Sequence, residues 1–211
     1  MAVTRFKSRT VDLEFRSAEE TQTDGRTLEG YAAVFDSQAR IGNSVEGHFV
    51  ETIKRGAFKK TLAERGSRVT MLWNHGKDPA VGQIPVGVYE ELREDEHGLY
   101  VRGRLLDTQH ADAVRQAIQA GAVRGMSVTF QVTDEMWHDS DGTRLHGDSI
   151  WRAMAKPGNL IQRTVTAVRL VEAGPVLTPA YEATSVGVRS NSSSIVIPRT
   201  IAEARLKLLD L

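Results

Sequence analysis

The chain has 211 residues, of which 40% are hydrophobic and 26% charged, as expected for one globular domain with short appendages. Its 27 Lys and Arg residues balance 27 Asp and Glu residues, which argues against a broad basic surface for nucleic acid. Cysteine is absent, so disulfides, thiolate metal sites and a cysteine nucleophile are excluded. No apolar signal core or membrane-length apolar run occurs, and we expect a soluble, unsecreted protein with no membrane partner.

Short strands and one helix are predicted in the N-terminal half of the chain. Alternating apolar residues predict strands over 11–15 and 28–35, which we expect to form a hairpin or to lie side by side. After a polar loop, apolar side chains among lysines predict a short helix over 56–66, with Gly66 as its C-terminal stop. Further strands are predicted over residues 69–73, 87–92 and 99–105.

A second helix is predicted immediately before the most informative strand. Asp107 or Thr108 is a suitable N-cap, and Gly121 is a suitable left-handed terminator. The apolar stripe of this helix consists of Ala111, Val114, Ala117 and Ile118. The helix leads into a strand over 126–132, and the turn-rich segment 138–159 is then predicted to be a surface excursion.

The C-terminal part divides into a last strand and a tail. Strand character returns over 163–171, and Pro175 and Pro179 argue against a continuous central strand beyond it. A serine-rich linker follows, and we therefore divide the chain into a domain over 1–188 and a tail over 189–211. A short amphipathic helix in the tail is predicted from the spacing of Ala202, Leu206 and Leu209.

Ser127 stands on the predicted strand that follows the second helix. It alternates with Met126 and Val128, so we expect its hydroxyl on an open face, away from the core. A serine held on a rigid strand is well placed to be a nucleophile if a histidine and an acid reach it. Most serines in this setting are strand surface, and the pattern alone leaves both interpretations open.

His75 is the preferred candidate for the base. Histidine suits this role because its ordinary pKa lies near neutrality. His75 closes an apolar strand after Trp73 and Asn74, although histidines at strand ends are often plain turn residues. The other histidines lie in polar loops, at the helix start or in the excursion, and they are His48, His97, His110, His138 and His146.

Glu172 is the candidate for the third group, which would orient the imidazole. It follows an apolar run and shares strand parity with Val168 and Leu170, and a carboxylate on such a face needs a partner. A neighbouring arginine, Arg169 or Arg163, would satisfy it as well as a histidine would. The pattern does not decide between these partners.

The excursion contains a weaker signal for a metal. Asp139 and Asp141 precede Gly142, with His138 and His146 nearby, but this run fails the calcium-loop template. An acidic turn is the preferred interpretation, and a metal-dependent hydrolase built on these four side chains is a weaker alternative. The glycines do not form a phosphate-binding loop that opens a helix, so we expect no metal and no cofactor.

Several sequence blocks occur in a specific order along the chain. They are Leu28–Phe35, Phe49–Phe58, Leu72–His75 with Val81–Gly82, Gly125–Phe130, and Leu170–Glu172 with Val176–Tyr181. Together they resemble the prohead (capsid maturation) proteases of tailed bacteriophages, serine endopeptidases distantly similar to herpesvirus assemblin. The resemblance covers residues 11–188, most of the chain.

The resemblance implies a fold, a site and a set of substrates. The fold would be α+β and mainly β, an assemblin-like β-barrel core flanked by a few helices. Ser127 would be the nucleophile, His75 the base and Glu172 the third member, although Ala173-Gly174 stands where the family commonly has Val-Ser. The substrates would be the scaffold protein or the scaffold segment of the major capsid protein, and the protease itself, inside the immature prohead in the host cytoplasm. The resemblance also leaves a homodimer open.

A non-catalytic assembly factor is the competing interpretation. Such a protein would keep the barrel and bind capsid subunits through the barrel and the tail. Both interpretations predict association with capsid protein, and they differ in chemistry. Labelling of Ser127 by a serine-directed acylating probe would favour the enzyme.

Overall fold

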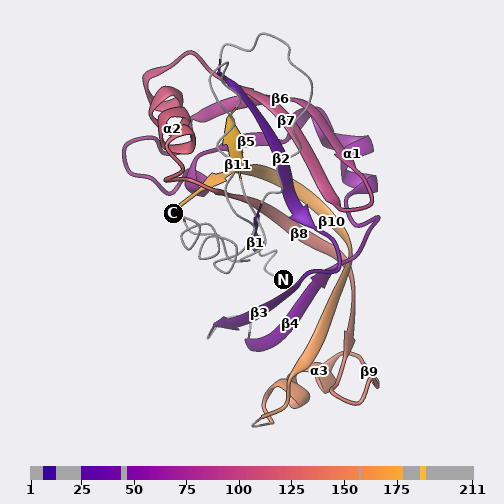
Figure 1. Cartoon of the computed structure of the whole chain (residues 1–211). Coiled ribbons are helices and arrows are strands. Elements are labelled where there is room, and N and C mark those ends of the chain that lie inside the picture. The colour runs from indigo at the N-terminus through magenta and orange to yellow at the C-terminus, as the bar shows by residue number, and fades with distance from the viewer. Residues whose placement is uncertain (1–6, 13–24, 44–46, 157, 178–185, 189–211) are drawn as a thin grey trace, which may run out of the picture.

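The computed structural model describes residues 7–12, 25–43, 47–156, 158–177 and 186–188, and these form a mainly β structure (Figure 1). One sheet contains β1 (Lys7–Asp12), β2 (Thr27–Val34), β3 (Gln38–Asn43), β4 (Gly47–Ile53), β5 (Thr70–Leu72), β6 (Pro85–Glu94), β7 (Gly98–Leu105), β8 (Gly125–His138), β9 (Arg144–Leu145), β10 (Ile161–Val176) and β11 (Val186–Val188). The helices in these ranges are α1 (Lys59–Arg65), α2 (Gln109–Gln119) and α3 (Asp148–Met154), with 3₁₀ turns η1 (Gly66–Arg68) and η2 (Asn74–Gly76). The predicted α+β, mainly β class is confirmed.

The strand order brings distant parts of the chain together. The main path runs β1-β8-β10-β5-β6-β7-β2-β11, while β4 joins β3 to β10 and β9 pairs with β8. At one end of this path β1 contacts β2, which lies near the other end. The described residues therefore form a mixed sheet, and no strand pairing within these ranges joins its two ends.

The two longest strands, β8 and β10, run the length of the molecule. They pair antiparallel from Gly125 opposite Val176 to His138 opposite Gln162. At the first end, β8 lies beside β1 and β10 lies beside β5. At the second end they extend away from the other strands together with β3, β4, β9 and α3, which we call the arm (Figure 1).

Apolar side chains of β8 anchor the core as the alternation predicts. Met126, Val128 and Phe130 are each completely buried in one cluster with residues of β2, β5 and β7. Burial of a side chain of this size contributes about 1.5–3 kcal/mol, so this face of β8 is held firmly in place.

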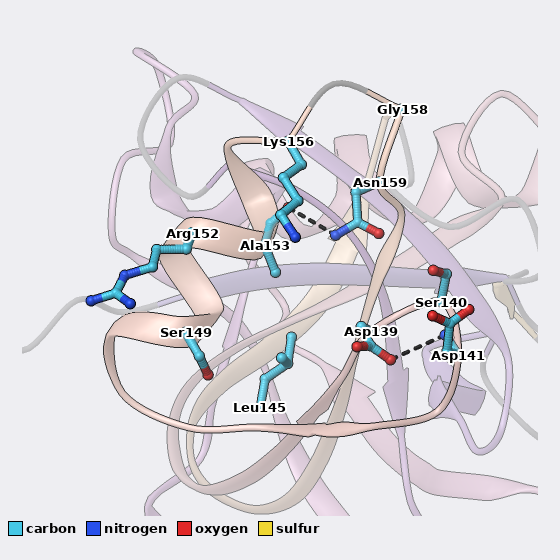
Figure 2. A pocket seen from close by; sticks show the side chains of 10 residues that line it. All are labelled: Asp139, Ser140, Asp141, Leu145, Ser149, Arg152, Ala153, Lys156, Gly158 and Asn159. Carbon is cyan, nitrogen blue, oxygen red and sulfur yellow. Dashed lines mark hydrogen bonds between the residues drawn. The ribbon is translucent and has the colours of Figure 1, made fainter.

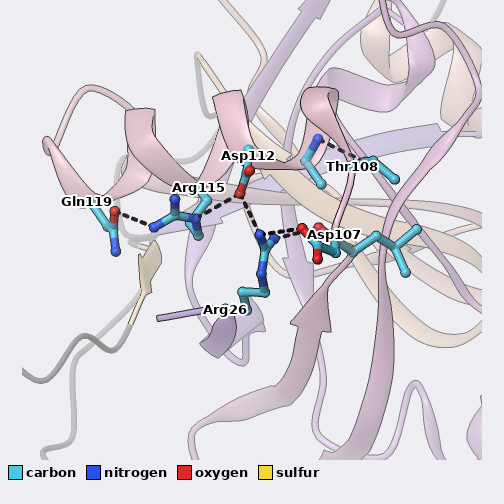
Figure 3. Close-up of polar contacts among 8 residues, drawn as sticks. Arg26, Asp107, Thr108, Asp112, Arg115 and Gln119 are labelled. Carbon is cyan, nitrogen blue, oxygen red and sulfur yellow. Dashed lines mark hydrogen bonds and ion pairs between the residues drawn. The ribbon is translucent and has the colours of Figure 1, made fainter. Parts of the chain in front are cut away.

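The predicted second helix is confirmed, and it delivers the chain to β8. The Thr108 hydroxyl caps α2 by accepting the Ala111 N–H at 3.3 Å, and Gly121 ends the turn with a φ of 70°. Arg26, directly before β2, contacts Asp107 at 2.8 Å and Asp112 at 2.9 Å (Figure 3). These contacts tie the start of the helix to the sheet.

The local predictions are met in part. β1 pairs with β8 and also contacts β2, so within the described residues the two strands lie near each other without pairing as a hairpin. The predicted stop at Gly66 is confirmed, because α1 ends at Arg65 with Gly66 as its C-cap, and Gly66 keeps a helical φ of −49° and begins the 3₁₀ turn η1. The prediction that Pro175 interrupts the strand is wrong, because Pro175 lies inside β10, opposite Met126 of β8 and beyond the end of β5 at Leu72.

The arm is more regular than its sequence suggests. β3 and β4 occupy a segment interpreted as a polar loop, and β9 and α3 lie within the predicted excursion. The tail over 189–211 and the positions of Thr178, Pro179 and Tyr181 lie outside the described residues. No helix in the described ranges is long and apolar enough to cross a membrane.

Candidate active site

Ser127 lies on β8 between two neighbouring strands. Its backbone is opposite Thr10 of β1 on one side and Gly174 of β10 on the other. The side chain points away from Met126 and Val128, as predicted, but it is 0% exposed. The expectation of an open face is therefore wrong, because both faces of the sheet are covered at this position.

A bulge in β10 brings Glu172 to the face of Ser127. Leu170 is opposite Phe130, but Glu172 is opposite Thr129, so the register shifts by one residue at Val171. Phe130 faces the core and Thr129 faces the other way. The predicted shared parity of Glu172 with Leu170 is therefore wrong, and the shift is what places the carboxylate on the serine side of the sheet.

His75 lies in η2, a turn with an unusual backbone. Asn74, His75 and Gly76 have φ values of 46°, 60° and 68°. Non-glycine residues rarely adopt this left-handed conformation, and strain of this kind is concentrated at functional sites. β5 runs parallel to β10 with Thr70 opposite Glu172, and the η2 turn after β5 contacts β10, so the His75 side chain reaches Glu172.

Asp78 organises the chain on both sides of His75. Its carboxylate accepts the backbone N–H groups of Ala80 at 2.9 Å and Val81 at 3.1 Å, and the Trp73 indole N–H at 3.2 Å. The N–H groups of Val81 and Ala80, followed by the Trp73 indole, lower the pKa of Asp78 below its usual value. At neutral pH this ionised carboxylate links the residue before the turn to the loop after it.

His75, Glu172 and Thr129 form one polar network. The Nδ1 atom of His75 lies 2.6 Å from Glu172 Oε1, and the two side chains are 12% and 7% exposed. The Thr129 hydroxyl donates to the same Oε1 and lies 3.2 Å from His75 Nδ1. A buried carboxylate at Nδ1 favours the tautomer that leaves Nε2 able to accept a proton, as the base of a hydrolytic triad must.

Gly174 permits β5 and its turn to approach β10. A Cβ atom at this position would lie 1.8 Å from the carbonyl oxygen of Leu72, so any larger residue would force the backbones apart. Leu72 is the last residue of β5, three residues before His75. The departure from the common Val-Ser thus has a local structural reason, since this backbone contact requires glycine.

Tyr89 of β6 lies close enough to Glu172 to respond to its charge. Burial raises the pKa of Tyr89 well above its usual value, and the Glu172 carboxylate raises it further. The phenol is therefore protonated at neutral pH. Among the described residues, neither the Tyr89 hydroxyl nor Glu172 Oε2 has a hydrogen-bond partner, although both atoms are buried.

In the part of the chain that the structure describes, the arginines and the other histidines that could bind Glu172 in place of His75 do not contact it. Arg163 binds Glu51 at 2.9 Å and Glu135 at 2.6 Å in the arm, so it does not satisfy Glu172. Arg169 is exposed on β10. Within the described ranges, no histidine other than His75 contacts Glu172, and His97 packs edge-on against Tyr31.

The metal alternative has no support in the described part of the chain. No group of three or more potential ligands that could hold a metal occurs there. Asp139 instead accepts the N–H groups of Asp141 at 3.0 Å and Thr143 at 2.8 Å, as the predicted acidic turn requires. This turn borders a pocket of about 610 Å³ in the arm, lined also by Arg152 and Lys156 (Figure 2). The pocket includes none of the three candidate catalytic residues.

Sequence interpretation missed three contributors to this site. The strand period of two puts Thr129 on the face of Ser127, and this is the signal from which its place could have been predicted. The contribution of Asp78 depends on the path of its loop, and that of Gly174 depends on a contact between distant segments. Neither was visible in the local pattern.

The chain belongs to the Caudovirus prohead serine protease family, whose sequence profile matches residues 11–196. The predicted resemblance is confirmed. Over 109 residues the chain is 40% identical to the "Prohead protease" of Enterobacteria phage HK97, an alignment that covers 51% of this chain and 43% of that relative. The chain therefore matches less than half of the relative's length. Among solved structures it is similar to the bacteriophage T4 capsid assembly protease, gp21, with a TM-score of 0.46, 12% identity, and coverage of 83% of this chain and 98% of that one.

Proposed function

We propose that the protein is a serine endopeptidase that acts in prohead maturation, with Ser127 as nucleophile, His75 as general base and Glu172 as the group that orients the imidazole. Family membership supports a serine protease. The observation that carries the residue assignment is the contact between His75 and Glu172, on the same side of the sheet as Ser127. No competing histidine within the described residues shares this arrangement.

The proposed chemistry follows the general serine mechanism. His75 Nε2 accepts the Ser127 proton while the serine oxygen attacks the peptide carbonyl carbon. The protonated imidazole then gives its proton to the leaving amine as the peptide C–N bond breaks, and water activated by His75 hydrolyses the acyl-enzyme. Glu172 stabilises the imidazolium in both steps and holds the proton on Nδ1.

The proposed substrates are the scaffold protein or the scaffold segment of the major capsid protein, and the protease itself. The family description and the name of the HK97 relative support a site of action inside the prohead, hence in the host cytoplasm. A closed assemblin-like barrel and a homodimer belong to the same proposal. Nucleic acid and membranes are not expected partners, given the balanced charge and the hydropathy of the sequence.

Co-expression with the cognate capsid precursor tests this function. We expect Ser127→Ala to abolish precursor cleavage, a loss of more than about 10³-fold, while the melting temperature stays close to that of the wild type. Ser149→Ala in the arm is the matched control, because its hydroxyl contacts only the backbone of His146 among the described residues. Undiminished cleavage by Ser127→Ala would refute the assignment, and assembly without cleavage by the wild type would favour the non-catalytic factor.

A further inference from the structure

Thr129 occupies a position from which it can act on both partners of the candidate relay. It lies two residues from Ser127 on the same face of β8 and directly opposite Glu172 of β10. Its hydroxyl contacts the carboxylate of Glu172 and the Nδ1 atom of His75. One short side chain thus meets the acid and the base together.

The hydrogen count at this junction defines the direction of each bond. A threonine hydroxyl has one hydrogen, and here it is donated to Glu172 Oε1. The oxygen of Thr129 therefore remains an acceptor toward His75 Nδ1, 3.2 Å away. Both atoms that contact Nδ1 among the described residues are then acceptors, so the proton of neutral His75 is held on Nδ1 and Nε2 is the unprotonated nitrogen that can accept one.

The contacts of Thr129 and His75 also hold the Glu172 carboxylate in one orientation. Oε1 of Glu172 contacts His75 Nδ1 and accepts a hydrogen bond from the Thr129 hydroxyl. Oε2 is buried and has no hydrogen-bond partner among the described residues. Removal of the threonine donor would leave His75 as the one partner of the carboxylate in these ranges. Threonine is β-branched and restricted at χ1, so its hydroxyl is held in place with little loss of rotamer freedom.

We propose that Thr129 is a positioning residue that fixes the Glu172 carboxylate and the reactive tautomer of His75. The inference rests on the proposed function, because it assigns Thr129 a part in the relay to Ser127. It assigns no contact with substrate. The expected effect is therefore on kcat, with KM changed less than about twofold.

Three threonine variants test the proposal. Thr129→Val keeps the shape of the side chain and removes the hydroxyl, and we expect kcat to fall about tenfold. Thr129→Ser restores the hydroxyl and should return kcat to within about threefold of the wild type. Thr166→Val is the matched control, because Thr166 donates to Asp134 at 2.7 Å across the same two strands in the arm. We expect it to leave kcat unchanged.

A spectroscopic measurement separates positioning from general destabilisation. In the inactive Ser127→Ala background, the proton NMR signal of the His75 Nδ1–H should shift in Thr129→Val and stay in place in Thr166→Val. An unchanged kcat and an unchanged signal in Thr129→Val would overturn the role of Thr129. If Ser127→Ala itself cleaves substrate, the proposed function fails instead, so the two failures are distinguishable.

Discussion

Two polar clusters with buried members lie along the same pair of long strands, β8 and β10, and differ in their chemistry. The site cluster consists of Ser127, Thr129, Glu172 and His75, and the arm cluster consists of Glu51, Glu135 and Arg163. In the arm the guanidinium, close to the rings of Phe49 and Trp137, is bound by two carboxylates.

The two clusters differ in whether they contain a group that can transfer a proton at neutral pH. An arginine is always protonated under ordinary conditions, so the arm cluster has no proton to transfer at neutral pH. The site cluster joins a carboxylate to an imidazole, a side chain that can accept and release a proton, on the same face as a serine. Burial and hydrogen bonding are common to both clusters, so they do not identify a catalytic site. The feature that leads us to propose the site cluster as catalytic is its imidazole, which lies on the same side of the sheet as a serine.

Among the variants that compare the two clusters, Glu172→Gln should have the largest effect on activity. This variant keeps the shape of the side chain and removes the negative charge that would stabilise the imidazolium, so we expect kcat to fall about 10²- to 10⁴-fold. The free energy of unfolding should stay close to the wild-type value, so that the loss of kcat is not explained by unfolding. Peptide cleavage measured beside chemical denaturation checks this, and a kcat within twofold of the wild type would remove Glu172 from the relay.

Disruption of the arm cluster should lower the free energy of unfolding and leave kcat nearly unchanged. Arg163→Met removes the guanidinium that binds Glu51, which is 0% exposed, and we expect the free energy of unfolding to fall by about 3–5 kcal/mol. The kcat of the molecules that remain folded should stay near the wild-type value, as active-site titration would show. A large loss of kcat per folded molecule would mean that the two clusters are coupled.

Gly174→Ala should affect stability and activity together. Its Cβ would collide with the Leu72 carbonyl, so β5 must move, and we expect a loss of about 1–3 kcal/mol together with a lower kcat because His75 follows β5. Gly66→Ala is the control, because Gly66 has a helical φ of −49° and nothing within 4 Å of a new Cβ. A melting temperature equal to the wild type in Gly174→Ala would refute the close contact.

The smallest effect concerns Asp78 and depends on pH. Because the folded protein lowers the pKa of Asp78, its stabilising effect is complete above the ordinary value of 3.8 and is lost as pH falls below it. The melting temperature of the wild type should therefore exceed that of Asp78→Ala at neutral pH, and the difference should shrink below pH 3.8. A difference that is constant with pH would show that the charged form contributes nothing.

Local sequence signals predicted the elements that depend on neighbours in the chain. α2 was predicted with its cap and terminator because Thr108 and Gly121 act within a few residues of themselves. The core face of β8 followed from strict alternation. The three candidate catalytic residues were selected from strand context and resemblance, and two of them, His75 and Glu172, lie in direct contact.

Long-range contacts account for what the sequence did not predict. The sequence pattern puts Glu172 on the same face as Leu170, but the bulge at Val171 moves it to the opposite face. Nothing in the apolar run predicts this bulge. The prediction that Ser127 lies on an open face was wrong, because segments distant in the sequence determine what covers a strand. β3 and β4 were missed because their polar and glycine-rich residues pair through backbone hydrogen bonds, which composition does not reveal.

The most direct test of Ser127 as the nucleophile is to label the protein with a serine-directed fluorophosphonate under assembly conditions and to locate the phosphonylated residue by mass spectrometry. We expect one probe adduct on the peptide that contains Ser127, formed as the serine oxygen displaces fluoride from phosphorus, strongly reduced in His75→Gln and absent in Ser127→Ala. Labelling of a different serine, or equal labelling of the wild type and Ser127→Ala, would contradict it.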